Sequence, residues 1–282
     1  MHIRFAQPAD TEQIIGLWQQ CFGDSPAFIS FYLQHHPFSE NTLLLALEGD
    51  VVLSMLSLLP TCFLYQDQQL PVRYVYAVGT DIRFRGQGLS TTLLDSAAQI
   101  CRENNEAGLF LIPASQSLFS FYSARGFYNA FGLQTETLLP ADFADVQPSD
   151  DIFLKPIAPE VIFPLRGRIL GRHQPFIQWD TKALGYAVSA TGAAGGDALG
   201  FYQGDTPVGY VFYEPFNGNC VIKEWGVPEH LERAALCALH ARLQRPRYVL
   251  RRPGQTPYGM LRPVSGALSL PKTLGYTGLI LD

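Results

Sequence analysis

The sequence has few charged residues and no strong excess of either sign. Asp, Glu, Lys and Arg make up 16% of the 282 residues, and the net charge is -5 at pH 7. An ordinary globular domain carries about 25%. Hydrophobic residues account for 47%, enough to build a core, so the composition does not predict disorder. The small negative charge argues against sequence-independent binding to nucleic acid, which needs a basic surface.

Cysteines are also few, and their spacing forms no known framework. There are five, an odd number, with no CxxC pair and no ladder of Cys and His at zinc spacing. This pattern predicts reduced thiols in a cytoplasmic protein and no bound metal. The cysteines are Cys21, Cys62, Cys101, Cys220 and Cys237.

Long hydrophobic runs are absent as well. The most apolar tract, residues 41–65, is interrupted by Glu48, Asp50 and Pro60. It therefore falls short of the ~20 apolar residues that a membrane helix needs. The opening residues MHIRFAQPAD lack the basic and apolar regions of a signal peptide. We expect no membrane association, and the sequence says nothing about the oligomeric state.

The first 140 residues alternate predicted strands and helices. A strand at 2–7 comes first, and Gly49 and Asp50 lie between two apolar runs, as in a hairpin. Helices are predicted at 11–22, 26–36, 89–104 and 116–125, and further strands at 72–80, 108–113 and from 128 onward. This order predicts a mixed α/β sheet of the α+β kind.

The second half repeats the order of the first. An acidic, proline-containing stretch at 141–160 is the predicted linker between domains at 1–142 and 152–282. After it we expect a helix at 160–170, a loop at 191–196 (TGAAGG), a hairpin turning at Gly204–Asp205, and then a strand, a helix and a strand at 220–227, 228–243 and 247–252. The repeated order predicts two tandem domains of one fold.

The stretch FRGQGLS, residues 84–90, joins a predicted strand to a predicted helix. A P-loop needs Lys before Ser or Thr after its last glycine, but Leu89 follows Gly88 here. A dinucleotide fingerprint needs a third glycine. The physics is still that of an anion site, because a helix N-terminus offers free N–H groups and glycines let a diphosphate come close. Arg83 and Arg85 can add charge-assisted hydrogen bonds.

At these residues the chain resembles the GCN5-related N-acetyltransferase (GNAT) superfamily. VGTDIRFRGQGLSTTLL, residues 78–94, is similar to its acyl-CoA-binding motif, and FYSARGF, residues 121–127, to its second landmark. The doubled order resembles tandem members of the enhanced-intracellular-survival type, without their C-terminal lipid-carrier-like domain. The resemblance implies a GNAT-like acyl-CoA N-acyltransferase fold in both domains. It also implies transfer of an acetyl group from acetyl-CoA, as cosubstrate, to a primary amine of a small molecule or peptide.

The resemblance also implies roles for individual residues. Tyr122 matches the tyrosine that protonates the departing thiolate. Ser90 replaces the usual Gly or Ala, and Ser115 stands where many members carry an Asn that touches the cofactor. The strand segment that holds the thioester and pantetheine corresponds to Val78, Gly79 and Thr80. The pyrophosphate loop corresponds to Arg85, Gly86, Gln87, Gly88, Leu89 and Ser90, with Arg83 beside it.

The general base is left open by the sequence. Asp81, Glu48 and Glu224 have no distinguishing spacing, and structural or surface roles fit each of them. A chain of water molecules or the C-terminal carboxylate of Asp282 are further candidates. The acyl acceptor is equally open.

The second domain has PEHLERA, residues 228–234, where the first has its glycine motif, so we expect that it has lost cofactor binding. Trp179, Tyr213 and Trp225 are candidates for a wall of the acceptor site, although core packing explains them equally well. Three other functions stay open. These are an acyl-CoA-binding module without turnover, an interaction protein whose glycine loop binds nothing, and transfer to oxygen or of longer acyl chains.

Overall fold

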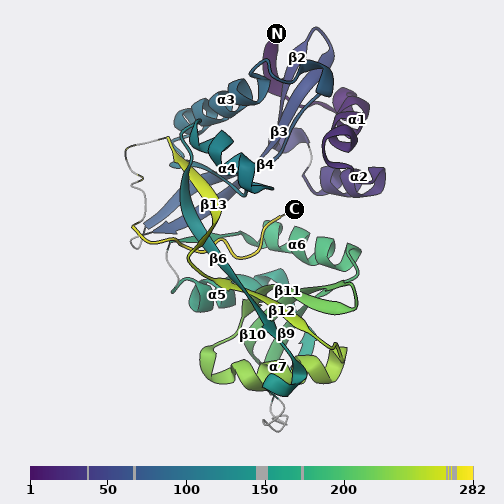
Figure 1. Cartoon of the computed structure of the whole chain (residues 1–282), viewed down its shortest axis with the longest axis vertical. Helices are drawn as coiled ribbons and strands as arrows, with labels where there is room; N and C mark the ends of the chain where they lie inside the picture. Colours follow the sequence, from purple (N-terminus) through teal and green to yellow (C-terminus); the bar gives the residue numbers. More distant parts are fainter. Residues whose placement is uncertain are drawn as a thin grey trace. The chain divides into compact units, whose positions relative to one another are not determined.

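The computed structural model describes residues 1–36, 38–65, 68–143, 152–172, 175–264, 266, 268 and 272–281. The chain packs as two compact units (Figure 1). Unit 1 contains Met1–Cys62, Gln69–Asn129 and Gly259–Leu270, and unit 2 contains Phe63–Gln68, Ala130–Tyr258 and Pro271–Asp282. The middle of the predicted linker, residues 144–151, and Asp282 lie outside the described residues. The division into domains 1–142 and 152–282 stays a prediction, because packing units do not establish ancestry.

Unit 1 is built on a mixed sheet. Its strand order is β1 (His2–Phe5), β2 (Leu43–Glu48), β3 (Val51–Tyr65), β4 (Gln68–Thr80), β5 (Gly108–Leu111) and β13 (Thr256–Pro263). β4 and β5 run parallel, whereas β5 and β13 run antiparallel. The predicted turn at Gly49 joins β2 to β3, with a left-handed φ of 57° at that glycine. A mixed α/β sheet is thereby confirmed for this half of the chain.

Helices cover both faces of this sheet (Figure 1). Neighbouring residues of β4 point to opposite faces, because side chains alternate along a strand. Val75 packs in a cluster with α3 (Leu89–Glu103), whereas the ring of Tyr76 lies 5.8 Å from that of Trp18 on α1 (Thr11–Phe22). α2 (Pro26–His35) begins at a capping serine, Ser25, whose side chain accepts a hydrogen bond from the Phe28 amide.

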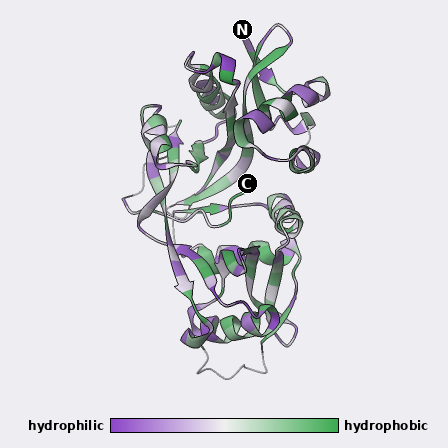
Figure 2. Cartoon of the chain, turned by 45° about the vertical axis from the view of Figure 1, so that its right-hand side comes forward, coloured by the Kyte–Doolittle hydropathy of each residue, from purple (hydrophilic) through white to green (hydrophobic). Residues whose placement is uncertain are grey.

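The core of unit 1 lies between α3 and the sheet. The buried face of α3 follows helical spacing, as the sequence pattern predicts, and much of the sheet is hydrophobic in Figure 2. That face consists of Leu89, Leu93, Leu94, Ala97, Ala98 and Cys101. The shorter α4 (Gln116–Ser123) contributes Tyr122 to the same cluster. The end of the sheet that leads into α3 is therefore fixed by packing.

Unit 2 has a second mixed sheet. Its strand order is β6 (Tyr128–Leu138), β12 (Tyr248–Pro253), β11 (Asn219–Gly226), β10 (Thr206–Phe216), β9 (Asp197–Gln203) and β7 (Phe153–Pro156). β11 and β12 run parallel, and β12 and β6 run antiparallel. Its helices are α5 (Pro159–Leu170), α6 (Thr181–Ala193) and α7 (Glu232–Leu243). A three-residue strand, β8 (Phe176–Gln178), lies between α5 and α6.

The two sheets have the same plan. In each, two helices separate the first edge strand from the next, and a single helix joins the two parallel strands. The last strand of each sheet comes from the other half of the sequence. β6 follows α4 but pairs with β12 of unit 2, and β13 follows β12 but pairs with β5 of unit 1.

One sequence expectation in unit 2 is wrong in part. Residues 191–196 were expected to form a loop, but α6 continues to Ala193, so only residues 194–196 lie outside the helix. The helix starts where Asp180 accepts a hydrogen bond from the Ala183 amide at 2.7 Å. Its glycines, Gly185 and Gly192, weaken a helix by about 1 kcal/mol each but do not end it when the helix packs on a sheet.

Two searches of the described part of the chain gave negative results. None of its helices is long and apolar enough to cross a membrane. No group of three or more His, Cys, Asp and Glu side chains in it could hold a metal ion.

Candidate functional site

Strands β4 and β5 separate at the end of the sheet that leads to α3. Their register covers only Val72–Tyr74 opposite Gly108–Phe110. β4 continues to Thr80 while β5 ends at Leu111, so the last part of β4 has no β5 partner in the described chain. Ala77, with a left-handed φ of 50°, interrupts the regular extension of β4 just before Val78. Val78–Thr80 therefore have no ladder partner from β5 in the described chain.

The glycine loop leaves a row of free amides. Gly86 and Gly88 have φ values of 78° and 80°, a conformation that favours glycine, and Gly88 is the N-cap of α3. A Cβ built on either glycine would meet open space, so conformation and not crowding selects glycine here. None of the amides of residues 86–91 has a hydrogen-bond partner among the described residues. Such a helix start attracts anions.

A cavity of about 350 Å³ connects these features. It reaches from the last residues of β4, past the glycine loop, to one face of α4. Its lining residues are Cys21, Phe22, Val78, Gly79, Thr80, Phe84, Arg85, Gly86, Gly88, Leu89, Ser90, Leu118, Phe121 and Tyr122. The strand segment, most of the loop and the tyrosine that the sequence singled out therefore lie around one space.

Hydrogen bonds fix the strand end beside the cavity. The buried Ser54 hydroxyl on β3 donates to the Gly79 carbonyl at 2.7 Å and lies 2.8 Å from the Thr80 hydroxyl. Arg85 folds back, and its Nε donates to the Thr80 carbonyl at 3.1 Å. The guanidinium is thus held at the strand end, on the wall of the cavity.

Arg83 has a different environment. Its side chain is 69% exposed, forms a bidentate pair with Asp81 and does not line the cavity. The hydrogen bonds from Arg83 lower the pKa of Asp81 to about 2. Asp81 also accepts from the Arg83 amide, so it caps the short turn before the glycine loop. A carboxylate held in this way is a poor proton acceptor.

Tyr122, on α4, also lines the cavity. It is only 7% exposed, and its hydroxyl has no hydrogen-bond partner in the part of the chain that is described. Burial raises the pKa of Tyr122 to about 12, with Arg125 lowering it slightly. The phenol is therefore protonated at neutral pH and can donate a proton.

The sequence missed five lining residues, and three of its candidates, Arg83, Gln87 and Ser115, do not line the cavity. Ser115 lies beside Ser117 at the start of α4. The missed residues are Cys21, Phe22, Phe84, Leu118 and Phe121. Cys21 and Phe22 lie about sixty residues away in sequence, so only the tertiary fold brings them here.

The other proposed bases lie elsewhere. Glu48 is exposed at the end of β2, and Glu224 is fully buried in unit 2, paired with Arg166. The cavity lining contains no carboxylate and no imidazole. Trp179 and Trp225 are core residues of unit 2, where Trp179 donates to the Leu279 carbonyl.

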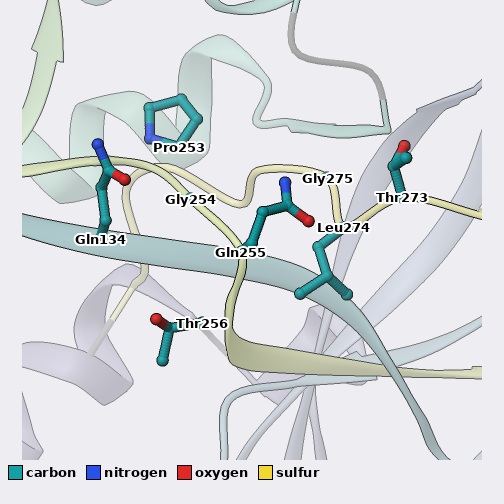
Figure 3. A pocket seen from close by; sticks show the side chains of 8 residues that line it. All are labelled: Gln134, Pro253, Gly254, Gln255, Thr256, Thr273, Leu274 and Gly275. Atoms are coloured by element: carbon teal, nitrogen blue, oxygen red, sulfur yellow. The ribbon is translucent and has the colours of Figure 1, made fainter.

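Unit 2 has a larger cavity of its own, of about 730 Å³ (Figure 3). In Figure 3, Gln134 of β6 lies at the left, Thr273 at the right, and Gln255, from the turn after β12, between them. None of its lining residues is titratable at neutral pH. It offers hydrogen bonds but no acid, base or thiol.

The strand-to-helix junction of unit 2 differs from that of unit 1. Between β11 and α7, Pro228 starts a short turn, and the Leu231 amide bonds back to the Pro228 carbonyl. Glu229 and Glu232 sit at the helix start, where they would repel a phosphate.

The chain was compared with known proteins. The family described as acetyltransferase (GNAT) domain matches residues 2–130. No curated protein matches the sequence.

Solved structures are similar over nearly the whole chain. A GCN5-related N-acetyltransferase from Anabaena variabilis has a TM-score of 0.77 at 16% identity and covers 94% of this chain and 73% of its own. Eis1 from Mycobacterium abscessus has a TM-score of 0.70 at 15% identity, covering 94% and 74%. A GCN5-related N-acetyltransferase from Sphaerobacter thermophilus has a TM-score of 0.55 at 14% identity, covering 95% and 97%. At these levels of sequence identity, the structural similarity shows that the fold is shared and nothing about function.

Proposed function

Because residues 2–130 match the family described as acetyltransferase (GNAT) domain, we propose that this chain transfers an acetyl group from acetyl-CoA to a primary amine of a small molecule or peptide. The observation that carries the proposal is the row of free amides at residues 86–91, beside a cavity that Tyr122 also lines. In this proposal the amides bind the diphosphate of acetyl-CoA, and Tyr122 acts at its acyl thioester.

The residues present fit the donor. The amides of the glycine loop bind the diphosphate, and Arg85 adds positive charge beside it. The edge of Val78–Thr80 that β5 leaves unpaired hydrogen-bonds the extended pantetheine arm as a further strand would. The apolar lining residues, such as Leu118 and Phe121, cover the arm. When bound, acetyl-CoA supplies an activated thioester.

Catalysis then rests on positioning and two polar groups. Holding the amine and thioester together removes several kcal/mol of the barrier. The Val78 amide is the candidate donor to the oxygen that gains negative charge. Tyr122 donates its proton to the departing sulfur, and its high pKa keeps that proton available at neutral pH. With no carboxylate in the lining, we assign removal of the amine proton to water.

We also propose that the second half is a degenerate copy of the first. The matching order of strands and helices in units 1 and 2 supports common descent. The proline and the two glutamates at the start of α7 support loss of acyl-CoA binding there.

Calorimetry and an amine screen test the proposal. CoA should bind, and pantetheine, which lacks the diphosphate, should bind at least tenfold more weakly if the free amides hold that group. Thiol release from acetyl-CoA is then measured against polyamines, aminoglycosides, amino acids and peptides. Binding without thiol release with any amine would favour an acyl-CoA-binding module without turnover. No heat and no thermal shift at millimolar CoA would leave only an interaction protein.

A further inference from the structure

Three residues that line the cavity have no part in binding the donor as proposed above. They are Cys21, Phe22 and Phe84. Phe22 is the last residue of α1, and it is 44% exposed although it lines a cavity. A half-exposed aromatic ring at this place offers a large apolar surface that the donor leaves unused.

The ring of Phe22 is held against the end of β4. It meets the ring of the buried Trp18 edge-on, with the two centroids 6.0 Å apart. A Cβ built on Gly79 would lie 3.4 Å from Cε2 of Phe22, so the ring rests on the strand segment that the proposed function assigns to the donor. Trp18 is fixed in turn, because its Nε1 donates to the Asp24 carboxylate at 2.8 Å. Phe22 is therefore a positioned part of the cavity wall.

The residues assigned to the donor lie on the other face of β4. Three lining residues of α4 pack in the hydrophobic cluster of α3, together with Val78 of β4, and these three are Leu118, Phe121 and Tyr122. Phe22 comes from α1, which packs on the opposite face of the same strand. With the donor on the α3 and α4 side, the amine reaches the thioester carbon from the side of Phe22.

The charges of the lining discriminate among amines. Among the described residues that line the cavity, Arg85 is the one charged side chain and none is a carboxylate. Two carboxylates close in sequence to the lining are engaged elsewhere, since Asp24 accepts from Trp18 and Asp81 pairs with Arg83. A polycation would therefore meet a like charge and no counter-charge. An apolar wall also favours the neutral form of an amine, which is the form that attacks a thioester.

We propose that Phe22 selects the acyl acceptor and that this acceptor is a primary amine with an aromatic group, an arylalkylamine, an inference that rests on the proposed function. The aromatic group packs on the Phe22 ring, and the amine nitrogen reaches the thioester. The bond from nitrogen to the acyl carbon forms, and the bond from that carbon to the sulfur of CoA breaks. The nitrogen loses a proton to water, and the sulfur gains one from Tyr122, which water then reprotonates. Polyamines and aminoglycosides are poor acceptors.

The first test compares amines on the wild-type chain by thiol release from acetyl-CoA. The probes are 2-phenylethylamine, methylamine, spermidine and kanamycin. We expect kcat/KM for 2-phenylethylamine to exceed that for each of the other three at least tenfold, because an aromatic ring leaves water for an apolar wall. Methylamine is the matched control, since it has the same reacting group and nothing to pack on Phe22.

Variants of Phe22 test whether the ring is responsible. Phe22→Ala should raise KM for 2-phenylethylamine at least tenfold and leave KM for methylamine within twofold. Phe22→Leu keeps part of the apolar surface, so its KM should lie between those of the wild type and Phe22→Ala. Phe22→Glu places a carboxylate in the lining and should shift the preference toward spermidine. Phe216→Ala, which removes an exposed ring at the end of β10 in unit 2, should change none of these values. Thermal unfolding checks that all four variants are folded.

Calorimetry with CoA separates the acceptor side from the donor side. The dissociation constant of CoA should be the same in the wild type and in the three Phe22 variants. A loss of CoA affinity in Phe22→Ala would place the ring in the donor site and overturn this inference. Faster thiol release with spermidine or kanamycin than with 2-phenylethylamine would also overturn it, and both results would leave the proposed function standing. Absence of CoA binding by the wild type would overturn both.

Discussion

Arg125 donates from Nε to the hydroxyl of Thr91 at 2.7 Å, which joins the residues after α4 to the first turn of α3. The same guanidinium donates to the Phe121 carbonyl at 2.6 Å and stacks 3.4 Å from the Phe121 ring. The helix that carries Tyr122 is therefore tied to the helix that carries the free amides. Arg125 thus links the two helices that line the cavity, in addition to their packing in one hydrophobic cluster.

Removing the hydrogen bond between Arg125 and Thr91 should weaken the packing of α4 on α3 beside the cavity. We expect Arg125→Met to weaken CoA binding several-fold. In a double-mutant cycle with Thr91→Val, the coupling free energy should be about 0.5–1.5 kcal/mol, the net value of one hydrogen bond. Urea unfolding and calorimetry measure the two effects. Arg102→Met, on α3, where the guanidinium donates to the exposed side chain of Gln99, should change neither.

The hydroxyl of Tyr122 should matter for turnover and not for donor binding. Tyr122→Phe keeps the ring packed but removes the proton donor, so we expect kcat to fall about 10²-fold, the scale of general acid catalysis. The dissociation constant of CoA should stay unchanged. An unchanged kcat would show that another group protonates the sulfur.

The pH profile gives a second check on Tyr122. Because its pKa is raised to about 12, the phenol loses its proton only above the usual tyrosine range. The turnover number should therefore show no decline up to about pH 10, where an unperturbed tyrosine titrates. A fall in kcat near pH 9 that Tyr122→Phe abolishes would contradict this assignment.

The glycine loop should tolerate no side chain at its N-cap. Gly88 has a φ of 80°, so Gly88→Ala should cost about 1–2 kcal/mol of stability or shift the loop, although the space around it is open. Either outcome weakens CoA binding. Gly16→Ala is the matched control, since Gly16 lies within α1 with open space around it. That change should stabilise the fold by about 0.5–1 kcal/mol.

Local patterns were enough to predict the donor half of the site. The apolar spacing of α3, the glycines before it and the serine before α4 are short-range signals, and each fixed an element near its true bounds. Cys21 has no such signal, because its place in the cavity lining depends on α1 packing against β4. The exchange of β6 and β13 between sheets is likewise a long-range pairing, which one sequence does not reveal.

α6 shows a different limit. The Asp180 cap was a readable signal, but the glycines near its end suggested a loop. Packing of buried residues such as Leu184 and Tyr186 outweighed the weak helix propensity. The ion pair of Glu224 with Arg166 could not be predicted from the sequence either, because Arg166 lies 58 residues before Glu224.

Acid should weaken the turn before the glycine loop through Asp81. Its pKa falls from 3.8 to about 2 on folding, mainly through hydrogen bonds from Arg83. A lowered pKa stabilises the fold above pH 4, and this contribution is lost as the pH falls toward 2. Asp81→Asn should therefore flatten the acid limb of the stability curve, measured by urea unfolding at several pH values. Asp205→Asn, at a fully exposed position, should leave that limb as in the wild type.

The buried pair of Arg166 and Glu224 should hold the C-terminal segment of unit 2. Both side chains are 0% exposed, and Arg166 also donates to the Thr277 carbonyl at 3.0 Å. Glu224 accepts from the Tyr210 hydroxyl at 2.7 Å and from the Leu279 amide. The ion pair thus binds residues 277 and 279 from both sides.

Breaking this pair should release the segment. Arg166→Met leaves a buried carboxylate without its counter-charge and should cost about 3–5 kcal/mol. Arg166→Lys keeps the charge but cannot bridge all its acceptors, so the loss should be smaller. Hydrogen exchange at residues 276–281 should rise in both variants more than in the β9–β10 hairpin. Lys155→Met, which breaks only the exposed pair with Asp205, should stay within about 0.5 kcal/mol of the wild type. Equal effects of Arg166→Met and Lys155→Met would show that the buried pair is not what fixes the segment.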